Sequence, residues 1–126
     1  MLEVLSKYKG KPYVCGVNDC HLMILELTGF DINKIKPFRT LKEGRKALVE
    51  STGFLTMPSY LSSKGYQKTN PRFICDGCIL LKGVHCFVYF DGLVFGVSKK
   101  SKTFEWCSID LNNLEKFEVY EWLRCF

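Results

Sequence analysis

The spacing of hydrophobic residues along the chain changes near residue 70. Before that point, apolar side chains recur every three or four residues, which is typical of helices with one buried face. Asn18 and Asp19 are good N-cap residues for one of these helices, and Thr40 with Glu43 forms a capping box for another. The expected helices cover residues 2–8, 20–27, a segment between 40 and 53, and a short segment between 58 and 65.

From residue 73 onward the apolar positions alternate as they do in strands. Asp91-Gly92 is the dipeptide favoured in a two-residue hairpin turn. The expected strands cover residues 78–81, 84–90, 93–97, 103–109 and 117–126. Because helices come first and strands follow, the sequence predicts one α+β domain over residues 1–126. Its helices, in residues 1–70, would pack on an antiparallel sheet formed by residues 71–126.

Composition narrows the class of protein without naming a function. The 126 residues are 47% hydrophobic and 25% charged, and 18 basic against 13 acidic side chains give a net charge of +5. An excess of this size is typical of a solvated surface, so nucleic acid is not expected as a partner. No apolar run reaches membrane-spanning length, and the first residues do not resemble a signal peptide. Synthesis in a reducing compartment is expected, where the seven cysteines indicate packing, metal binding or catalysis.

The segment with the most chemical content is residues 10–20, in which a loop with two glycines leads into a capped helix. Cys20 lies in the first turn of that helix, where the helix dipole favours the thiolate, and free N–H groups there could form an oxyanion hole. The chain has two histidines. His21 follows Cys20 directly, and side chains of adjacent helical residues point about 100° apart, so His85 on a predicted strand is the better candidate for the base.

Several motifs resemble the NlpC/P60 superfamily of cysteine peptidases and amidases, especially a compact branch found among phage tail proteins. Residues 12–20 (PYVCGVNDC) resemble its nucleophile motif PYxWGGxDC, and residues 28–31 (TGFD) resemble TGxD. Residues 76–81 (DGCILL) resemble the GDVVL strand, and residues 121–124 (EWLR) resemble a terminal AWR strand. The resemblance therefore implies a papain-like fold over nearly the whole chain.

The resemblance also implies a role for each matched residue. Cys20 would be the nucleophile, His85 the general base, and Tyr13 would orient or polarise the attacked carbonyl. The substrate would be an amide bond, with peptidoglycan stem peptides as the leading class, and no metal or organic cofactor is needed. Synthesis in a host cytoplasm, followed by assembly with other tail proteins in a virion, would fit this branch.

The chain departs from the family pattern at four positions, one of which is Gly77-Cys78 in place of the GD before the strand. Cys15 and Val17 stand where the motif has tryptophan and glycine. The polar residue that normally orients the histidine would fall at Gly96 or Val97, which leaves Ser98 or a backbone carbonyl as the substitute. An alternative function is therefore a catalytically degenerate structural or assembly component of a phage tail.

A third hypothesis is a zinc-binding module built on Cys75-Asp76-Gly77-Cys78. A C-x-x-C pair is half of a common zinc site. Its partners would come from Cys15, Cys20 and His21, or from His85 and Cys86, although these spacings are looser than those of known zinc motifs. Cys86, Cys107 and Cys125 lie among aromatic residues of predicted strands and are expected to serve in packing or to be exposed thiols.

Overall fold

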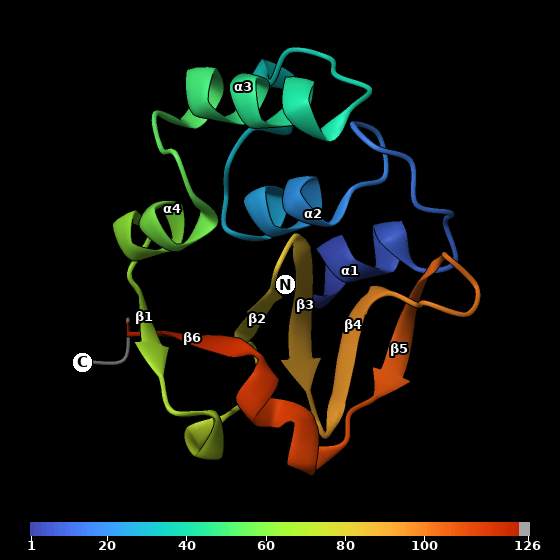
Figure 1. The fold of residues 1–126 in the computed structure, drawn as a ribbon, viewed down its shortest axis with the longest axis vertical. Helices are drawn as coiled ribbons and strands as arrows, with labels where there is room; N and C mark the ends of the chain where they lie inside the picture. The colour runs from blue at the N-terminus through green and yellow to red at the C-terminus, as the bar shows by residue number, and fades with distance from the viewer. Residues whose placement is uncertain (124–126) are drawn as a thin grey trace.

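A computed structural model describes residues 1–123 of the chain, and Figure 1 shows its helices grouped on one side of a sheet. The helices are α1 (Leu2–Tyr8), α2 (Cys20–Leu27), α3 (Leu41–Thr52) and α4 (Met57–Ser63). Three short 3₁₀ segments are η1 (Ile32–Lys34), η2 (Pro71–Phe73) and η3 (Leu111–Lys116). The strands are β1 (Tyr66–Thr69), β2 (Ile79–Lys82), β3 (His85–Phe90), β4 (Leu93–Val97), β5 (Phe104–Ser108) and β6 (Glu118–Trp122). No helix within residues 1–123 has the length and apolar character to cross a membrane.

All six strands belong to one antiparallel sheet with the order β1-β6-β2-β3-β4-β5. The predicted α+β class, with helices before an antiparallel sheet, is confirmed. The sequence prediction did not include β1, which lies within the part expected to be helical and pairs with β6 along the edge of the sheet. Residues 124–126 of the predicted last strand lie outside the described residues.

The sheet is covered on both faces. On one face, α1 to α4 bury apolar side chains of the strands, among them Ile79, Val88 and Phe95, each with no exposed surface. The other face carries a smaller cluster around Leu80 and Val119, covered in part by Leu114 of η3. Because both faces are buried, successive residues of β2 and β3 are apolar and the strict alternation of a one-sided sheet is lost.

Two tight hairpins fix the register of β3 against its neighbours. Asp91 and Gly92 have φ angles of 47° and 79°, as a type I′ turn requires, and they join the paired residues Phe90 and Leu93. The predicted turn is confirmed. The β2–β3 hairpin is equally short: Gly83 and Val84 separate Lys82 from its partner His85. This register decides which face of the sheet each residue of β3 occupies.

The loop that precedes α2 is held by the end of the sheet. Gly10 donates a backbone hydrogen bond to Phe104 at 2.8 Å, and Tyr13 donates one to Lys102 at 2.9 Å. The loop then turns at Gly16, whose φ of 80° favours glycine and whose Cα lies against the backbone of Phe38. A short bridge to β5 and a glycine turn thus place the first residue of α2.

Replacing Gly16 with alanine is expected to destabilise the fold more than the same change at Gly10. Both glycines have a φ near 80°, which costs roughly 1–2 kcal/mol for a residue with a Cβ. A Cβ at Gly16 would also overlap the carbonyl oxygen of Phe38, whereas nothing lies within 4 Å of one at Gly10. Denaturant unfolding should show an additional loss of roughly 1–3 kcal/mol for Gly16→Ala. Equal losses in the two variants would contradict the close approach of the loop to Phe38.

Candidate functional site

The carboxylate of Asp19 caps α2 and organises the residues around it. The side chain is 2% exposed and accepts hydrogen bonds from the backbone N–H of His21 at 2.9 Å and of Gly16 at 3.3 Å. The same oxygen that accepts from the His21 backbone lies 3.3 Å from Nδ1 of the His21 ring. One buried carboxylate therefore fixes both the helix start and the position of an imidazole.

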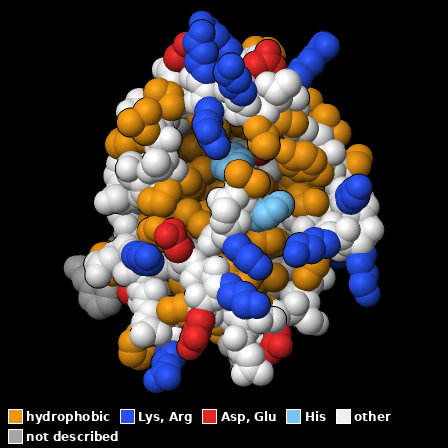
Figure 2. Space-filling model, in the orientation of Figure 1, with side chains coloured by type: hydrophobic (Ala, Val, Ile, Leu, Met, Phe, Trp, Pro, Cys, Tyr) orange, Lys and Arg blue, Asp and Glu red, His pale blue; other side chains and the backbone are white. Residues whose placement is uncertain are grey.

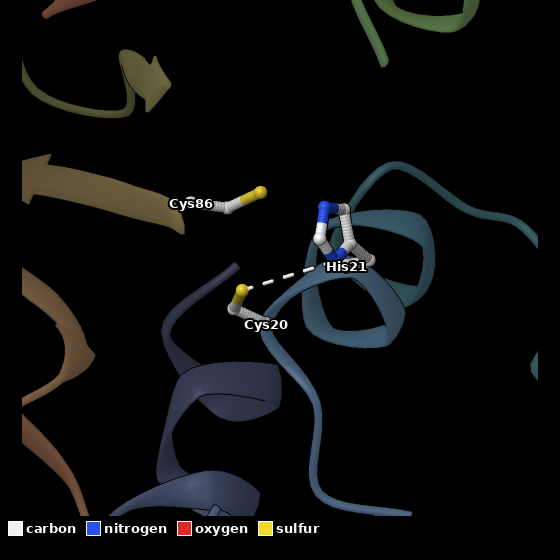
Figure 3. Close-up of side chains that lie close together, drawn as sticks. All are labelled: Cys20, His21 and Cys86. Carbon is white, nitrogen blue, oxygen red and sulfur yellow. Dashed lines mark hydrogen bonds between the residues drawn. The ribbon is translucent and has the colours of Figure 1, made fainter. Parts of the chain in front are cut away.

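Cys20 is the first residue of α2, and its side chain is enclosed by the helix and by β3. Its Sγ lies 4.0 Å from Nδ1 of His21 and 3.7 Å from the carbonyl oxygen of Val84. Cys86 approaches from β3, and one ligand atom from each of Cys20, His21 and Cys86 lies within 4.8 Å of the others. Figure 3 shows the two thiols and the ring facing a common space. Two cysteines and a histidine thus meet where α2 packs on β3.

The contact between Cys20 and His21 differs from the sequence expectation. Adjacent helical side chains diverge by about 100°, and on that basis His21 was not expected to share a proton with Cys20. Both residues lie in the first turn, however, and the Asp19 carboxylate holds the ring on the side of Cys20. The fixed cap therefore brings together two side chains that helical geometry alone would separate.

The charges at this site reinforce one another. Burial opposes ionisation of Asp19, but the hydrogen bonds from His21 outweigh it and lower the pKa of the carboxyl group. Burial would lower the pKa of His21, yet Asp19 and Cys20 raise it to about 10. These shifts favour an aspartate and an imidazolium at neutral pH.

The pKa values of the two thiols, Cys20 and Cys86, shift in opposite directions. A hydrogen bond from the Cys86 thiol, with further help from His21, lowers the pKa of Cys20 in spite of its burial. The same hydrogen bond and the burial of Cys86 raise the pKa of that second thiol. Cys20 is therefore the sulfur that carries negative charge, and Cys86 keeps its proton.

The Asp19 cap uses one of the N–H groups that the sequence offers for an oxyanion hole. The free N–H groups of the first turn were expected to offer an oxyanion hole. The N–H group of His21 already donates to Asp19, so it is not available to a substrate oxygen. The expectation therefore remains for the other N–H groups of the first turn, such as that of Cys20.

A cavity of about 600 Å³ adjoins the cluster, between α3, α4 and the β2–β3 hairpin. Asp19, His21 and Cys86 belong to its lining and Cys20, which is 5% exposed, does not. The lining combines apolar and polar side chains, and it carries the cations Arg45, Lys82 and Lys116 together with the carboxylates Asp19 and Glu118. In Figure 2, apolar side chains cross the middle of this face, with lysine and arginine side chains above and below them. The cluster therefore opens toward a cavity suited to an amphipathic, negatively charged ligand.

The structure places His85 apart from this cluster. His85 begins β3 and is exposed, while the next residue, Cys86, is 2% exposed and faces α2. Within residues 1–123, no side chain forms a hydrogen bond or ion pair with His85. Both histidine side chains are nevertheless visible on the same face of the molecule (Figure 2). The imidazole in contact with Cys20 is that of His21.

Tyr13 lies near the site on the loop before α2 and is 39% exposed. Burial and the charges of Asp19, Cys15 and Cys20 raise its pKa. The phenol thus keeps its proton and remains a donor near Cys20. This location is compatible with the carbonyl-orienting role that the motif resemblance implies.

The position of a third catalytic residue is empty of polar side chains. Gly96 packs against the ring of Phe87, which a Cβ at this position would overlap. The hydroxyl of Ser98 accepts a hydrogen bond from the Lys100 N–H at 3.3 Å within the β4–β5 turn. Among the described residues, no hydrogen bond links Ser98 with His85. The polar side chain that contacts an imidazole in this structure is that of Asp19, which lies beside His21.

The C-x-x-C pair lies away from this cluster, before β2. The sulfur atoms of Cys75 and Cys78 are 3.6 Å apart, with Cys75 exposed and Cys78 buried. Among residues 1–123, the structure brings no further histidine, cysteine or acidic residue into a group of three around this pair. The pair alone offers two ligands.

Sequence reasoning missed two members of the cluster, Cys86 and the His21 ring. Both faces of β3 are apolar, so alternation does not reveal whether His85 or Cys86 faces the helices. Cys86 shares a face of β3 with Val88, which has no exposed surface, but the sequence alone does not show that this face meets the helices. For His21, the signal is the N-cap aspartate two residues earlier. Comparison of the chain with protein-family models, with curated proteins and with solved structures finds no match.

Replacing Asp19 with alanine is expected to destabilise the protein by about 2–4 kcal/mol, because the helix loses its cap and buried N–H groups lose their acceptor. Asp31 provides a matched control, since it caps η1 in the same way with an exposed side chain. Asp31→Ala should cost about 1 kcal/mol or less. Chemical denaturation of both variants measures the difference. Similar losses would show that burial of Asp19 adds nothing to the cap.

Proposed function

We propose that this chain is a cysteine hydrolase of amide bonds, with a papain-like arrangement in which Cys20 is the nucleophile. The observation that carries the proposal is the 4.0 Å separation between Cys20 Sγ and His21 Nδ1 at the start of α2. A nucleophile beside an imidazole that a third group orients is the common plan of enzymes that form acyl intermediates. Asp19 supplies the third group, although it contacts the same ring nitrogen, Nδ1, as Cys20, whereas in the common plan the orienting group binds the other nitrogen.

In the proposed reaction, the Cys20 thiolate attacks the carbonyl carbon of the substrate and forms a tetrahedral intermediate. The C–N bond then breaks, the imidazolium of His21 gives its proton to the leaving amine, and a thioester remains on Cys20. Water attacks the thioester with His21 as the base, which releases the carboxylic acid and restores the ion pair. No redox partner is required.

Three other residues have roles in this proposal. Asp19 keeps the imidazole in place and stabilises its charged form, and the phenol of Tyr13 is a donor for the attacked carbonyl. The motif resemblance gives the proton-transfer role to His85, whereas the observed contact favours His21. Mutagenesis can therefore decide between them, because only replacement of the histidine that transfers the proton should strongly reduce activity.

The proposed substrate is a peptide that carries negative charge, with peptidoglycan stem peptides as the leading class. The motif resemblance supports the class of bond. The cavity supports the charge, because the three cations Arg45, Lys82 and Lys116 outnumber the carboxylates Asp19 and Glu118 in its lining. The same resemblance is the basis for proposing that the protein is made in a host cytoplasm and works with phage tail proteins.

A second candidate function is supported by the burial of the nucleophile. Cys20 is 5% exposed and does not line the cavity, whereas its neighbours His21 and Cys86 do, so a substrate carbonyl reaches the sulfur after these side chains part. A closed site of this kind also fits a degenerate member that serves as a structural or assembly component of a phage tail. This second function needs the fold but not the thiol.

Digestion of purified peptidoglycan fragments tests the proposed function. Wild type should release a new amine and a new carboxylate, and Cys20→Ala should release neither, because no other group in the proposal forms the thioester. His21→Ala should lose roughly 10²- to 10⁴-fold in rate. Cys75→Ala, an exposed thiol elsewhere, and His85→Ala should retain activity.

Each alternative gives a different result in this assay. Loss of activity in His85→Ala but not in His21→Ala would assign the base as the motif resemblance does. Equal activity of Cys20→Ala and wild type would contradict cysteine catalysis. No product from any variant would contradict the peptidoglycan substrate and favour the structural role.

A further inference from the structure

The geometry points to a metal site formed by Cys20, His21 and Cys86, which binds a thiophilic divalent ion such as Zn²⁺. This inference goes beyond the proposed function, since it needs no substrate and concerns a different state of the same side chains. One ligand atom from each of the three residues lies within 4.8 Å of the other two. Figure 3 shows them pointing toward one another from α2 and β3.

The donor set selects the class of ion. Two cysteine sulfurs and one imidazole nitrogen form a soft to borderline set, which prefers Zn²⁺ over the oxygen-seeking ions Mg²⁺ and Ca²⁺. Zinc binds sulfur at about 2.3 Å and nitrogen at about 2.0–2.1 Å in a tetrahedron. Those bond lengths put neighbouring ligand atoms roughly 3.5–3.8 Å apart. The observed ligand atoms lie within 4.8 Å of one another, so the side chains have to move closer by up to about 1 Å to bind the ion.

Asp19 completes the surroundings of the ion. A metal-binding histidine commonly donates its second ring N–H to a carboxylate, which fixes the ring and strengthens the ligand. Asp19 Oδ1 lies 3.3 Å from Nδ1 of His21 and is itself buried. With Nδ1 held by Asp19, Nε2 is the nitrogen left for the ion.

The fourth coordination position would face the cavity. His21 and Cys86 both line that cavity, so an ion held between them is accessible to a water molecule or an anionic ligand from that side. Three protein ligands and one open position are typical of zinc sites that exchange a ligand, whereas purely structural sites have four protein ligands. The inferred site is therefore one that binds a small exogenous ligand as well as the ion.

Binding of the ion changes the protonation of the cluster and competes with catalysis. Zn²⁺ displaces the proton of the Cys86 thiol and the Nε2 proton of the His21 imidazolium, which are released to solvent, and the thiolate of Cys20 then donates an electron pair to the metal. In that form Cys20 is not free to attack a carbonyl. If the proposed hydrolase function holds, the ion is an inhibitor of it.

Cobalt titration of the full chain tests the site. The protein is prepared with a chelator and a non-thiol reductant, the chelator is removed, and Co²⁺ is added as the probe. A tetrahedral site with two thiolates should show a thiolate-to-cobalt charge-transfer band and intense visible bands, with one ion per chain. Addition of Zn²⁺ should abolish these bands by displacement.

Variants locate the ion. Cys86→Ser and His21→Ala should lose the tetrahedral spectrum, and Asp19→Asn should weaken binding about 10- to 100-fold. The double variant Cys75→Ser/Cys78→Ser is the matched control and should bind as wild type, because that sulfur pair lies outside the cluster. Thermal unfolding of each metal-free variant shows that it is folded.

Two results would overturn the inference. One is no tetrahedral cobalt spectrum in folded, reduced wild type, and the other is loss of the spectrum in the Cys75/Cys78 variant but not in Cys86→Ser. Neither result depends on hydrolysis, because the readout is metal absorption without substrate. Conversely, an inactive protein that binds Co²⁺ through Cys86 would retain the metal site and lose the proposed hydrolase function.

Discussion

The site depends on one buried carboxylate. Asp19 is charged, 2% exposed and surrounded by hydrogen-bond donors from its own loop and helix. A buried carboxylate without donors would be strongly destabilising, so the loop turn at Gly16 and the start of α2 are constrained to supply them. The same constraint sets the ring of His21 beside Cys20. Helix capping and the chemistry of the cluster are thus two consequences of one interaction.

The sheet supplies the second half of the cluster through its register. The two-residue β2–β3 hairpin at Gly83 and Val84 puts Cys86, not His85, on the face that α2 covers. It also brings the Val84 carbonyl oxygen within 3.7 Å of Cys20 Sγ. A change of one residue in this hairpin would exchange the faces of His85 and Cys86, because side chains alternate along a strand. The length of the hairpin therefore decides which side chains form the cluster, just as the residue types do.

Much of the fold could be predicted from local signals. The capping residues before α2 and α3 and the Asp91-Gly92 turn act within a few residues, and each is present as expected. The edge strand β1 could not be predicted in the same way, since its central residues Gln67 and Lys68 are polar and its partner β6 is more than fifty residues away. Strand pairing over that distance is set by the completed core and leaves little trace in the local pattern.

The site could be predicted only in part for the same reason. The position of Cys20 at a helix start follows from its neighbours in sequence, but its partners depend on tertiary packing and on a side-chain contact at a helix cap. The choice between Cys86 and His85 requires the phase of β3, which a strand buried on both faces does not reveal. The contact between His21 and Cys20 depends on the Asp19 carboxylate, which holds the ring in place and which local helical geometry does not predict.

The rate of Cys20 alkylation measures which imidazole acts on the thiol. Metal-free, reduced protein is treated with iodoacetamide at pH 7 in the presence of EDTA, and labelling of Cys20 is followed by mass spectrometry. Because His21 contacts the sulfur and stabilises its thiolate, His21→Ala should slow labelling by about tenfold or more, while His85→Ala should react as wild type. Slow labelling in His85→Ala with an unchanged rate in His21→Ala would contradict this account of the site.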